Sequence, residues 1–292
     1  MANFGPKDIK KLREMTDAGM MDCKQALTAT DGDMEAAVEW LRKKGLGAAA
    51  KKADKVAAEG VVAIKADGNK AIMVEINSQT DFVAKNDKFQ SFVSEVVEHA
   101  FANDFDTAED INSSEINGQP FADYLALQIA TIGENLVVRR FAKVVTNGSL
   151  GTYVHANGKV GVIVASDAEG VEEQLKNIAM HAAAMNPRYI NEAAVDSETI
   201  EKEKEIAREQ LIKEGKPEAI LEKILPGKIK RFLQDNTLEN QKFVMDDKVS
   251  VAEYLAQANK DAKLTEYVRF ELGEGVEKVE EDFAAEVAKQ MA

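Results

Sequence analysis

Two stretches of the sequence, 60-GVVAIKADGNKAIMVEINSQ-79 and 151-GTYVHANGKVGVIVASDAEG-170, follow one pattern and decide the fold. Each begins with glycine, continues as a short alternating strand, and enters a hydrophobic second strand after Asp67-Gly68-Asn69 or Asn157-Gly158. Asp-Gly and Asn-Gly between such runs are strong signals of a β-hairpin. The sequence therefore predicts two hairpins built on the same plan.

Each hairpin is followed by an amphipathic helix and, later in the chain, by a third strand. The apolar helix positions are Phe89, Phe92, Val93, Val96 and Val97 in the first repeat and Leu175, Ile178, Ala179 and Ala182 in the second. The third strands are 135-NLVVRRFAKVV-145 and 265-TEYVRFELGEG-275. We therefore expect an α+β protein with two related subdomains, each a small antiparallel sheet backed by helices.

Residues 7–45 predict three short helices, because apolar residues recur there at helical spacing between turn signals. The third helix is expected to stop near Gly45. The stretch 46-LGAAAKKADKVAAEG-60 has few large apolar residues and is interpreted as a linker, partly helical. A three-helix domain of this size has little core of its own.

Residues 196–234 interrupt the second repeat and predict a helical hairpin, in which Gly215 ends one helix and Pro217 starts the other. Ile200, Ala207 and Leu211 form a thin apolar stripe with the spacing of a two-helix seam. Two interpretations stay open: a solvated antiparallel pair, or an arm for self-association. The amphipathic stretch 276-VEKVEEDFAAEVAKQMA-292 predicts a C-terminal helix that packs on its own core or docks on a partner.

These patterns divide the chain into five parts. Residues 1–55 form a helical domain and linker, 56–148 the first core subdomain, 149–195 with 235–273 the second core subdomain, 196–234 the arm, and 274–292 a C-terminal helical module.

Composition excludes several classes of protein. The chain has 292 residues and a formal charge of −14, which argues against nucleic-acid binding because phosphate contacts need clustered Lys and Arg. The charge is unevenly distributed along the chain. Residues 1–55 carry eleven Lys and Arg against nine Asp and Glu, so the excess of acidic residues lies in the rest of the chain. The single cysteine, Cys23, excludes an internal disulfide. There is no apolar run long enough to span a membrane and no signal-peptide core, so we expect a cytoplasmic protein.

A search for catalytic chemistry finds no convincing site. His99, His155 and His181 are far apart and lack metal-ligand spacing. His99 and His181 are expected to be structural, and Cys23 to be an inert packing residue. No phosphate-binding glycine loop is present. We therefore expect no cofactor, no metal and no catalytic residue, and a protein that works through its surfaces.

One residue of 75-EINSQTDFVAKNDKF-89 is hard to place. Phe82 stands among polar residues directly after a run typical of a buried strand. Val83, Phe89, Phe92 and Val93 already supply an apolar helix face, and Asn86-Asp87 offer a helix cap, which would leave Phe82 on the connection. From these residues alone, a core position and an exposed apolar tip both stay open.

Several stretches together resemble the bacterial translation elongation factor Ts family, the guanine-nucleotide exchange factors of the GTPase elongation factor Tu. The resemblance covers nearly the whole chain and is carried by 19-GMMDCKQAL-27, 75-EINSQTDFVAKN-86, 133-GENLVVRR-140, 155-HANGKVGV-162, 178-IAMHAAA-184 and 268-VRFELGEG-275. It implies a ubiquitin-associated-like (UBA-like) helical domain at 1–55, a two-part core, a coiled-coil dimerisation arm and a C-terminal module.

The resemblance also implies roles for particular residues. Thr80, Asp81, Phe82 and Val83 would dislodge Mg²⁺ from the nucleotide site of elongation factor Tu, with Asp81 and Phe82 as the intruding pair. Ser78 replaces the cysteine of some members, at a position that does not intrude. Partner-binding positions by the same resemblance are Arg13, Met20, Met21, His155, Gly158 and Gly161.

The expected partner is therefore elongation factor Tu, GDP-bound or nucleotide-free, with a possible homodimer or 2:2 complex through the arm and no direct contact with nucleic acid or membrane. Two other functions remain as alternatives. One is an adaptor or scaffold that uses the small helical domain, and the other an enzyme that uses His155 as an acid–base group.

Overall fold

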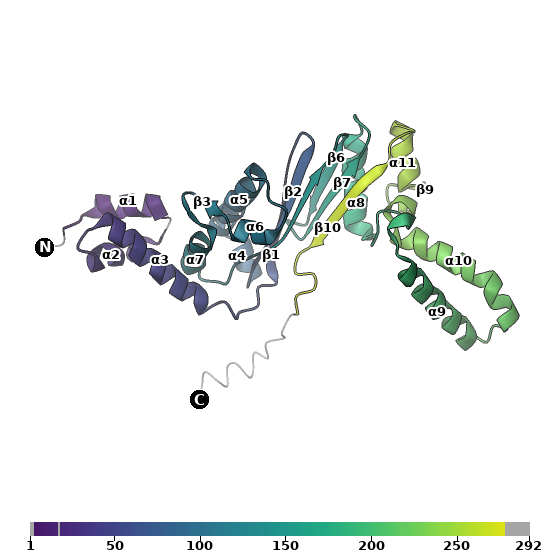
Figure 1. Ribbon diagram of the computed structural model, residues 1–292, viewed down its shortest axis with the longest axis horizontal. Coiled ribbons are helices and arrows are strands. Elements are labelled where there is room, and N and C mark those ends of the chain that lie inside the picture. Colours follow the sequence, from purple (N-terminus) through teal and green to yellow (C-terminus); the bar gives the residue numbers. More distant parts are fainter. Residues whose placement is uncertain (1–2, 17, 278–292) are drawn as a thin grey trace. The chain divides into compact units, whose positions relative to one another are not determined.

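The computed structural model describes residues 3–16 and 18–277 and shows a mixed α+β fold with small sheets, as expected (Figure 1). The chain divides into two compact units. The first unit holds the described residues through Ala63, then Val74–Ala142, and the described residues from Glu271 onward. The second unit holds Ile64–Met73 and Lys143–Phe270.

The three expected helices at the start of the first unit are α1 (Pro6–Thr16), α2 (Met20–Ala29) and α3 (Met34–Ala50). They pack around a small apolar cluster that includes Leu12, Cys23 and Leu27. The expectation that the third helix stops near Gly45 is wrong. Gly45 is buried against the backbone of Ala126, and the alanines that follow favour the helix, so α3 continues to Ala50.

The first sheet has the strand order β1-β2-β5, with β1 at Glu59–Asp67, β2 at Lys70–Ser78 and β5 at Val137–Val145. The three expected strands thus form one sheet, and the second hairpin strand lies in its centre. Residues from Ala71 to Ser78 are buried on both faces of β2. The helix expected after the hairpin is α5 (Asp87–Ala102), and all five of its predicted apolar residues are buried.

Four further elements of the first unit had no counterpart in the sequence analysis. They are α6 (Ala108–Asn112), β3 (Glu115–Ile116), β4 (Gln119–Pro120) and α7 (Phe121–Ile132). α7 packs against α3, so the small helical domain shares part of its buried surface with the rest of the first unit.

A buried carboxylate joins three distant parts of the first unit. Glu75, fully buried in β2, accepts a hydrogen bond from the backbone N–H of Gly273 at 2.9 Å. Its other oxygen lies 2.8 Å from Arg139 and is also bonded to Arg140. Both arginines contact Glu274. Because the charge of Glu75 is compensated on both oxygens, it can be buried.

The second sheet repeats the plan with the order β10-β7-β6, formed by β6 (Leu150–His155), β7 (Val160–Ser166) and β10 (Leu264–Glu271). α8 (Glu172–Met185) packs on β6 and β7, and its four predicted apolar residues are buried. The expectation that the last strand reaches residue 275 is wrong, since β10 ends at Glu271 and Gly273 has a φ of 72°.

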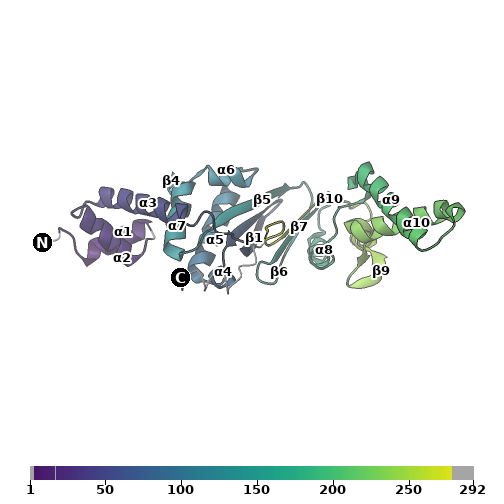
Figure 2. The same ribbon diagram turned by 90° about the horizontal axis from the view of Figure 1, so that it is seen from below.

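Near the arm, the second unit has a short hairpin of β8 (Lys242–Phe243) and β9 (Asp246–Ser250), followed by α11 (Val251–Ala258). The buried residues Phe243, Val251 and Leu255 join the apolar cluster formed by α8. The sequence analysis did not predict these elements. Figure 2 shows them from a second direction.

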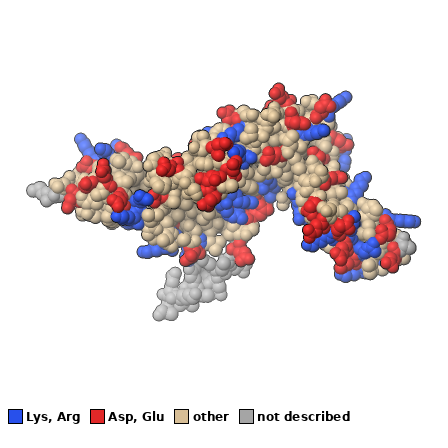
Figure 3. All heavy atoms as spheres, in the orientation of Figure 1, with Lys and Arg blue, Asp and Glu red and all other residues tan. Residues whose placement is uncertain are grey.

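The helical hairpin consists of α9 (Ser197–Lys213) and α10 (Glu218–Asn236), close to the predicted limits. Its apolar core is small, with Ala207, Leu211, Leu221 and Leu225 buried and Ile200 only half-buried. Acidic and basic side chains are mixed over its surface (Figure 3). At its base, the N–H groups of Arg188 and Tyr189 both donate to the carbonyl of Asn236.

Two remaining observations concern the C-terminus and membranes. The predicted C-terminal helix lies mostly outside the described residues, which end at Glu277. In the described ranges, no helix combines the length and the apolar character that crossing a bilayer requires.

Candidate partner-binding site

The structure answers the question of Phe82. Residues Asp81–Ala84 form the one-turn helix α4, and the Phe82 side chain on it is 81% exposed. The sequence analysis would leave Phe82 on a connection before the helix, and the single helical turn corrects that detail. An aromatic ring that is exposed to this degree contributes little to the core of its own chain.

Local sequence explains why the chain turns here. Thr80 caps α4 by accepting a hydrogen bond from the N–H of Val83 at 3.3 Å, and Asn86 caps α5 by accepting one from Lys88 at 2.9 Å. Two caps so close together leave room for only one turn between them. Ala84 is the buried residue of that turn, so Phe82, two positions earlier, points away from the core.

The start of α4 is held by a side chain from elsewhere in the first unit. One oxygen of Glu134 accepts hydrogen bonds from the N–H groups of Gln79 and Thr80, at 3.1 and 3.0 Å. The other oxygen accepts the hydroxyl of Thr80 at 2.7 Å. Glu134 belongs to the family-like stretch 133-GENLVVRR-140, but no role was predicted for it from the sequence.

Glu134 is itself fixed by its neighbours. α7 ends at Gly133, whose φ of 91° is favourable only for glycine. The carbonyl of Gly133 accepts a hydrogen bond from the Lys52 ammonium. On the other side, the buried Asn135 donates to the carbonyl of Lys55 at 2.8 Å. The turn that carries Glu134 is thus bound to the segment after α3.

Asp81 carries the negative charge of the tetrad Thr80–Val83. Its carboxylate lies 2.7 Å from the Lys85 ammonium, one turn further along the chain. The side chain of Lys85 is 75% exposed and that of Asp81 47%, so this ion pair contributes little to stability.

Three other predicted residues lie on the small helical domain. Arg13 is exposed on α1, and Met20 and Met21, at the start of α2, are 57% and 65% exposed. Arg13 and Met20 line a groove of about 460 Å³ together with Lys88 of α5 and residues of α7. α5 follows directly after α4, so this groove and the tetrad use the same part of the first unit.

The remaining predicted residues lie in or beside the turn between β6 and β7 in the second unit. His155 is exposed at the end of β6, where its Nδ1 lies 3.0 Å from the Tyr153 hydroxyl. Ala156, Asn157 and Gly158, in the loop between the two strands, all have positive φ, which glycine adopts without steric cost. Gly158 and Gly161 are buried. The structure brings these three residues together at one turn of the second unit.

The other histidines and the cysteine are structural, as predicted. His181 is fully buried between Gln241, 2.9 Å from its Nε2, and the N–H of Val244, and burial lowers its pKa. Nε2 of His99 lies 2.7 Å from the Ser114 hydroxyl, and burial lowers the pKa of His99 as well. Cys23 is buried, which raises the pKa of its thiol. Within residues 3–16 and 18–277, no group of three or more His, Cys, Asp or Glu could hold a metal ion.

Comparison with known proteins gives consistent matches. The sequence model of the family described as "Elongation factor TS" matches residues 79–274. The elongation factor Ts of a Sulfurovum species is 50% identical, over 100% of both chains. The elongation factor Ts of a Nitratiruptor species is 52% identical over 97% of each chain, and that of Nautilia profundicola is 48% identical over 100% of both.

These matches define a translation elongation factor, a protein of the protein-synthesis machinery, and the α+β fold is consistent with that class. The chain belongs to the elongation factor Ts family.

Proposed function

We propose that the chain is the guanine-nucleotide exchange factor of elongation factor Tu. In this proposal it binds the GDP-bound GTPase, displaces Mg²⁺ from the nucleotide site and promotes GDP release. The observation that carries the proposal is the 81% exposure of Phe82 on a one-turn helix whose start is tied down by Glu134. The exchange factor itself makes and breaks no covalent bond.

Within this function, Phe82 inserts between elements of the GTPase beside the metal site. Asp81 perturbs the polar groups that hold the water shell of Mg²⁺, and Thr80 and Val83 fix the turn that carries both.

The free energies involved indicate that burial of Phe82 alone cannot drive nucleotide exchange and that other contacts must contribute. Exchange requires the factor to bind the nucleotide-free GTPase more tightly than the GDP-bound form. A shift of about 10⁴ in that equilibrium needs roughly 5.5 kcal/mol of differential binding. Burial of one Phe gives only about 1.5–3 kcal/mol.

We assign the remaining contacts to the other predicted residues. Arg13, Met20 and Met21 hold the nucleotide-binding domain of the partner from the small helical domain, which we interpret as UBA-like. The turn with His155, Gly158 and Gly161 meets another domain of the partner. The exposed methionines support this assignment, because flexible apolar side chains suit an adaptable binding surface.

The wider organisation is part of the same proposal. We assign residues 1–55 to the UBA-like domain and linker, 56–148 and 149–195 with 235–273 to the two core subdomains, and 274–292 to a C-terminal module. Residues 196–234 form a coiled-coil arm that joins two copies in a homodimer or a 2:2 complex. The buried pairs between α9 and α10 and the exposed Ile206, Ile212 and Ile220 support this role.

The test is the release of fluorescent GDP from elongation factor Tu after mixing with each variant. Phe82→Ala and Asp81→Ala should slow release, while the free energy of unfolding changes little because Phe82 is exposed and the ion pair of Asp81 is weak. Val145→Ala, which removes an apolar side chain that is 56% exposed on β5, is the matched control and should release GDP at the wild-type rate. Wild-type rates for both tetrad variants would refute the proposal.

A further inference from the structure

The carboxylate of Glu134 holds the point at which β2 ends and the tetrad begins. It accepts two backbone N–H groups and one hydroxyl, at 2.7 to 3.1 Å. An ionised carboxylate can do this because it is acceptor-only, with about four lone-pair sites. Hydrogen bonds to a charged acceptor are also about twice as strong as neutral ones. The direction of the chain at Thr80 is therefore set by a residue that is 54 positions away.

The ring of Phe82 cannot fix its own direction, because most of its surface has no contact with the chain. A single helical turn is also a weak structure by itself, since its nucleation is unfavourable. Rigidity at this site must come from the anchors at its ends. At the start of α4 the anchor is Glu134, which in turn is fixed between Gly133 and the buried Asn135.

We propose that Glu134 is a positioning residue for nucleotide exchange. Its carboxylate fixes the direction in which α4 projects Asp81 and Phe82, and it touches neither the nucleotide nor the metal. This inference rests on the proposed function of the tetrad. A group held in the productive orientation before binding loses less entropy on binding, and a displacement of about 1 Å can cost on the order of 10²-fold in rate.

The chain offers a matched control in Asp110 of the same unit. Its carboxylate accepts the N–H of Asp106 at 3.1 Å, the N–H of Thr107 at 2.8 Å and the hydroxyl of Thr107 at 2.8 Å. This is the same set of donors as at Glu134, but it caps the short helix α6. Asp110→Ala therefore removes an equivalent set of bonds away from the tetrad.

The first experiment measures amide hydrogen exchange in the free chain by NMR. In the wild type, the amides of Gln79 and Thr80 should be protected. Glu134→Ala should remove that protection, and Asp110→Ala should leave it unchanged. Equal protection of both amides in Glu134→Ala would overturn the proposal, whatever the result with the partner.

The second experiment measures the GDP release rate from elongation factor Tu as a function of factor concentration. Glu134→Ala should lower the rate at saturation roughly tenfold or more, because the ring no longer points toward its target. The half-saturating concentration should change little, because the other contacts remain. Glu134→Gln, which keeps one acceptor oxygen, should lie between the wild type and Glu134→Ala. Asp110→Ala should match the wild type. A normal rate at saturation for Glu134→Ala would overturn the proposal.

A combined variant separates positioning from a general structural effect. If Glu134 acts through Asp81 and Phe82, then adding Glu134→Ala to the variant Asp81→Ala/Phe82→Ala should cause no further loss of rate. If Glu134→Ala lowered the rate of that background further, the positioning role would be overturned, while the function of the tetrad would stay intact. Wild-type rates for both Phe82→Ala and Asp81→Ala would instead refute the exchange mechanism, and the role of Glu134 in it would fall at the same time.

Discussion

At the scale of single residues, the first unit contains two carboxylates with different surroundings. Glu75 is fully buried and bonded to two arginines and a backbone N–H, whereas Glu134 is half-buried and holds a turn. Both take more than one partner, so neither is an ordinary solvated acid. Their roles differ, because removal of Glu75 affects the fold and removal of Glu134 affects the direction of one short helix.

We expect Glu75→Gln to destabilise the protein by about 3 kcal/mol or more, because two guanidinium groups then lose their buried counter-charge. The free energy of unfolding in urea, followed by circular dichroism, measures this loss. Glu274→Gln is the control from the same network. Its side chain is 54% exposed, so the change should cost less than about 1 kcal/mol. Equal losses for the two variants would contradict the interpretation that burial decides the effect.

At the scale of elements, the sequence predicted the regular parts well. Both hairpins, both following helices and the helical hairpin lie where their periodicity placed them, because each is specified by a local pattern of apolar residues. α7 and the β8–β9 hairpin were missed. α7 is largely buried along its length, including polar residues such as Gln128, so it lacks a clear amphipathic stripe.

The candidate site was only partly predictable for a physical reason. An apolar residue at helical spacing looks the same in a sequence whether it faces the core or the solvent, so Phe82 stayed ambiguous. Glu134 could not be found from local pattern at all, because its partners Gln79 and Thr80 are more than fifty positions away. Only the folded chain shows that the turn after α7 meets the end of β2.

Two glycine-to-alanine substitutions, one at a crowded position and one at an open position, test how the helices and strands pack. A Cβ on Gly151 of β6 would lie 2.2 Å from the backbone of Leu175, so Gly151→Ala should destabilise the protein by about 1–3 kcal/mol or more. A Cβ on Gly47 of α3 meets nothing within 4 Å, so Gly47→Ala should stabilise by about 0.5–1 kcal/mol through helix propensity. Urea unfolding of both variants measures these changes in the free energy of unfolding. If both variants were stabilised, or both destabilised, the packing argument would be refuted.

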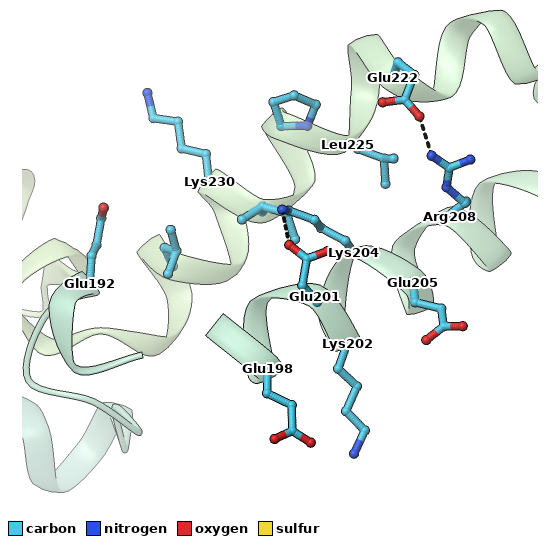
Figure 4. A pocket seen from close by; sticks show the side chains of 13 residues that line it. Glu192, Glu198, Glu201, Lys202, Lys204, Glu205, Arg208, Glu222, Leu225 and Lys230 are labelled. Atoms are coloured by element: carbon cyan, nitrogen blue, oxygen red, sulfur yellow. Dashed lines mark hydrogen bonds and ion pairs between the residues drawn. The ribbon is translucent and has the colours of Figure 1, made fainter. Parts of the chain in front are cut away.

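At the scale of the whole molecule, the arm formed by α9 and α10 is an insertion that is joined to the rest of the second unit at its base. Its groove, about 1180 Å³ in volume, is lined by charged residues around Leu225 and Ile229, and Figure 4 shows the ion pairs Lys204–Glu201 and Arg208–Glu222. Such surface pairs contribute little to stability. The arm is therefore held at its base by backbone hydrogen bonds and along its length by a thin apolar seam.

We expect a variant in which residues 197–235 are replaced by a Gly-Ser linker to keep a folded core, because most bonds that close the base belong to residues outside the deleted segment. If the arm joins two copies, this deletion should reduce the molar mass in solution from dimer to monomer, as measured by light scattering after size exclusion. The point variant Ile212→Glu, at an exposed apolar position on α9, should weaken the dimer in the same way. A dimer that survives the deletion would refute the role of the arm.

The bond between Glu75 and Gly273 joins residues 198 positions apart. During synthesis, β2 leaves the ribosome long before that glycine is translated, and a nascent carboxylate at position 75 must meanwhile stay hydrated or pair with its arginines alone. The strand that leads into the tetrad thus receives this buried contact only after Gly273 has been synthesised.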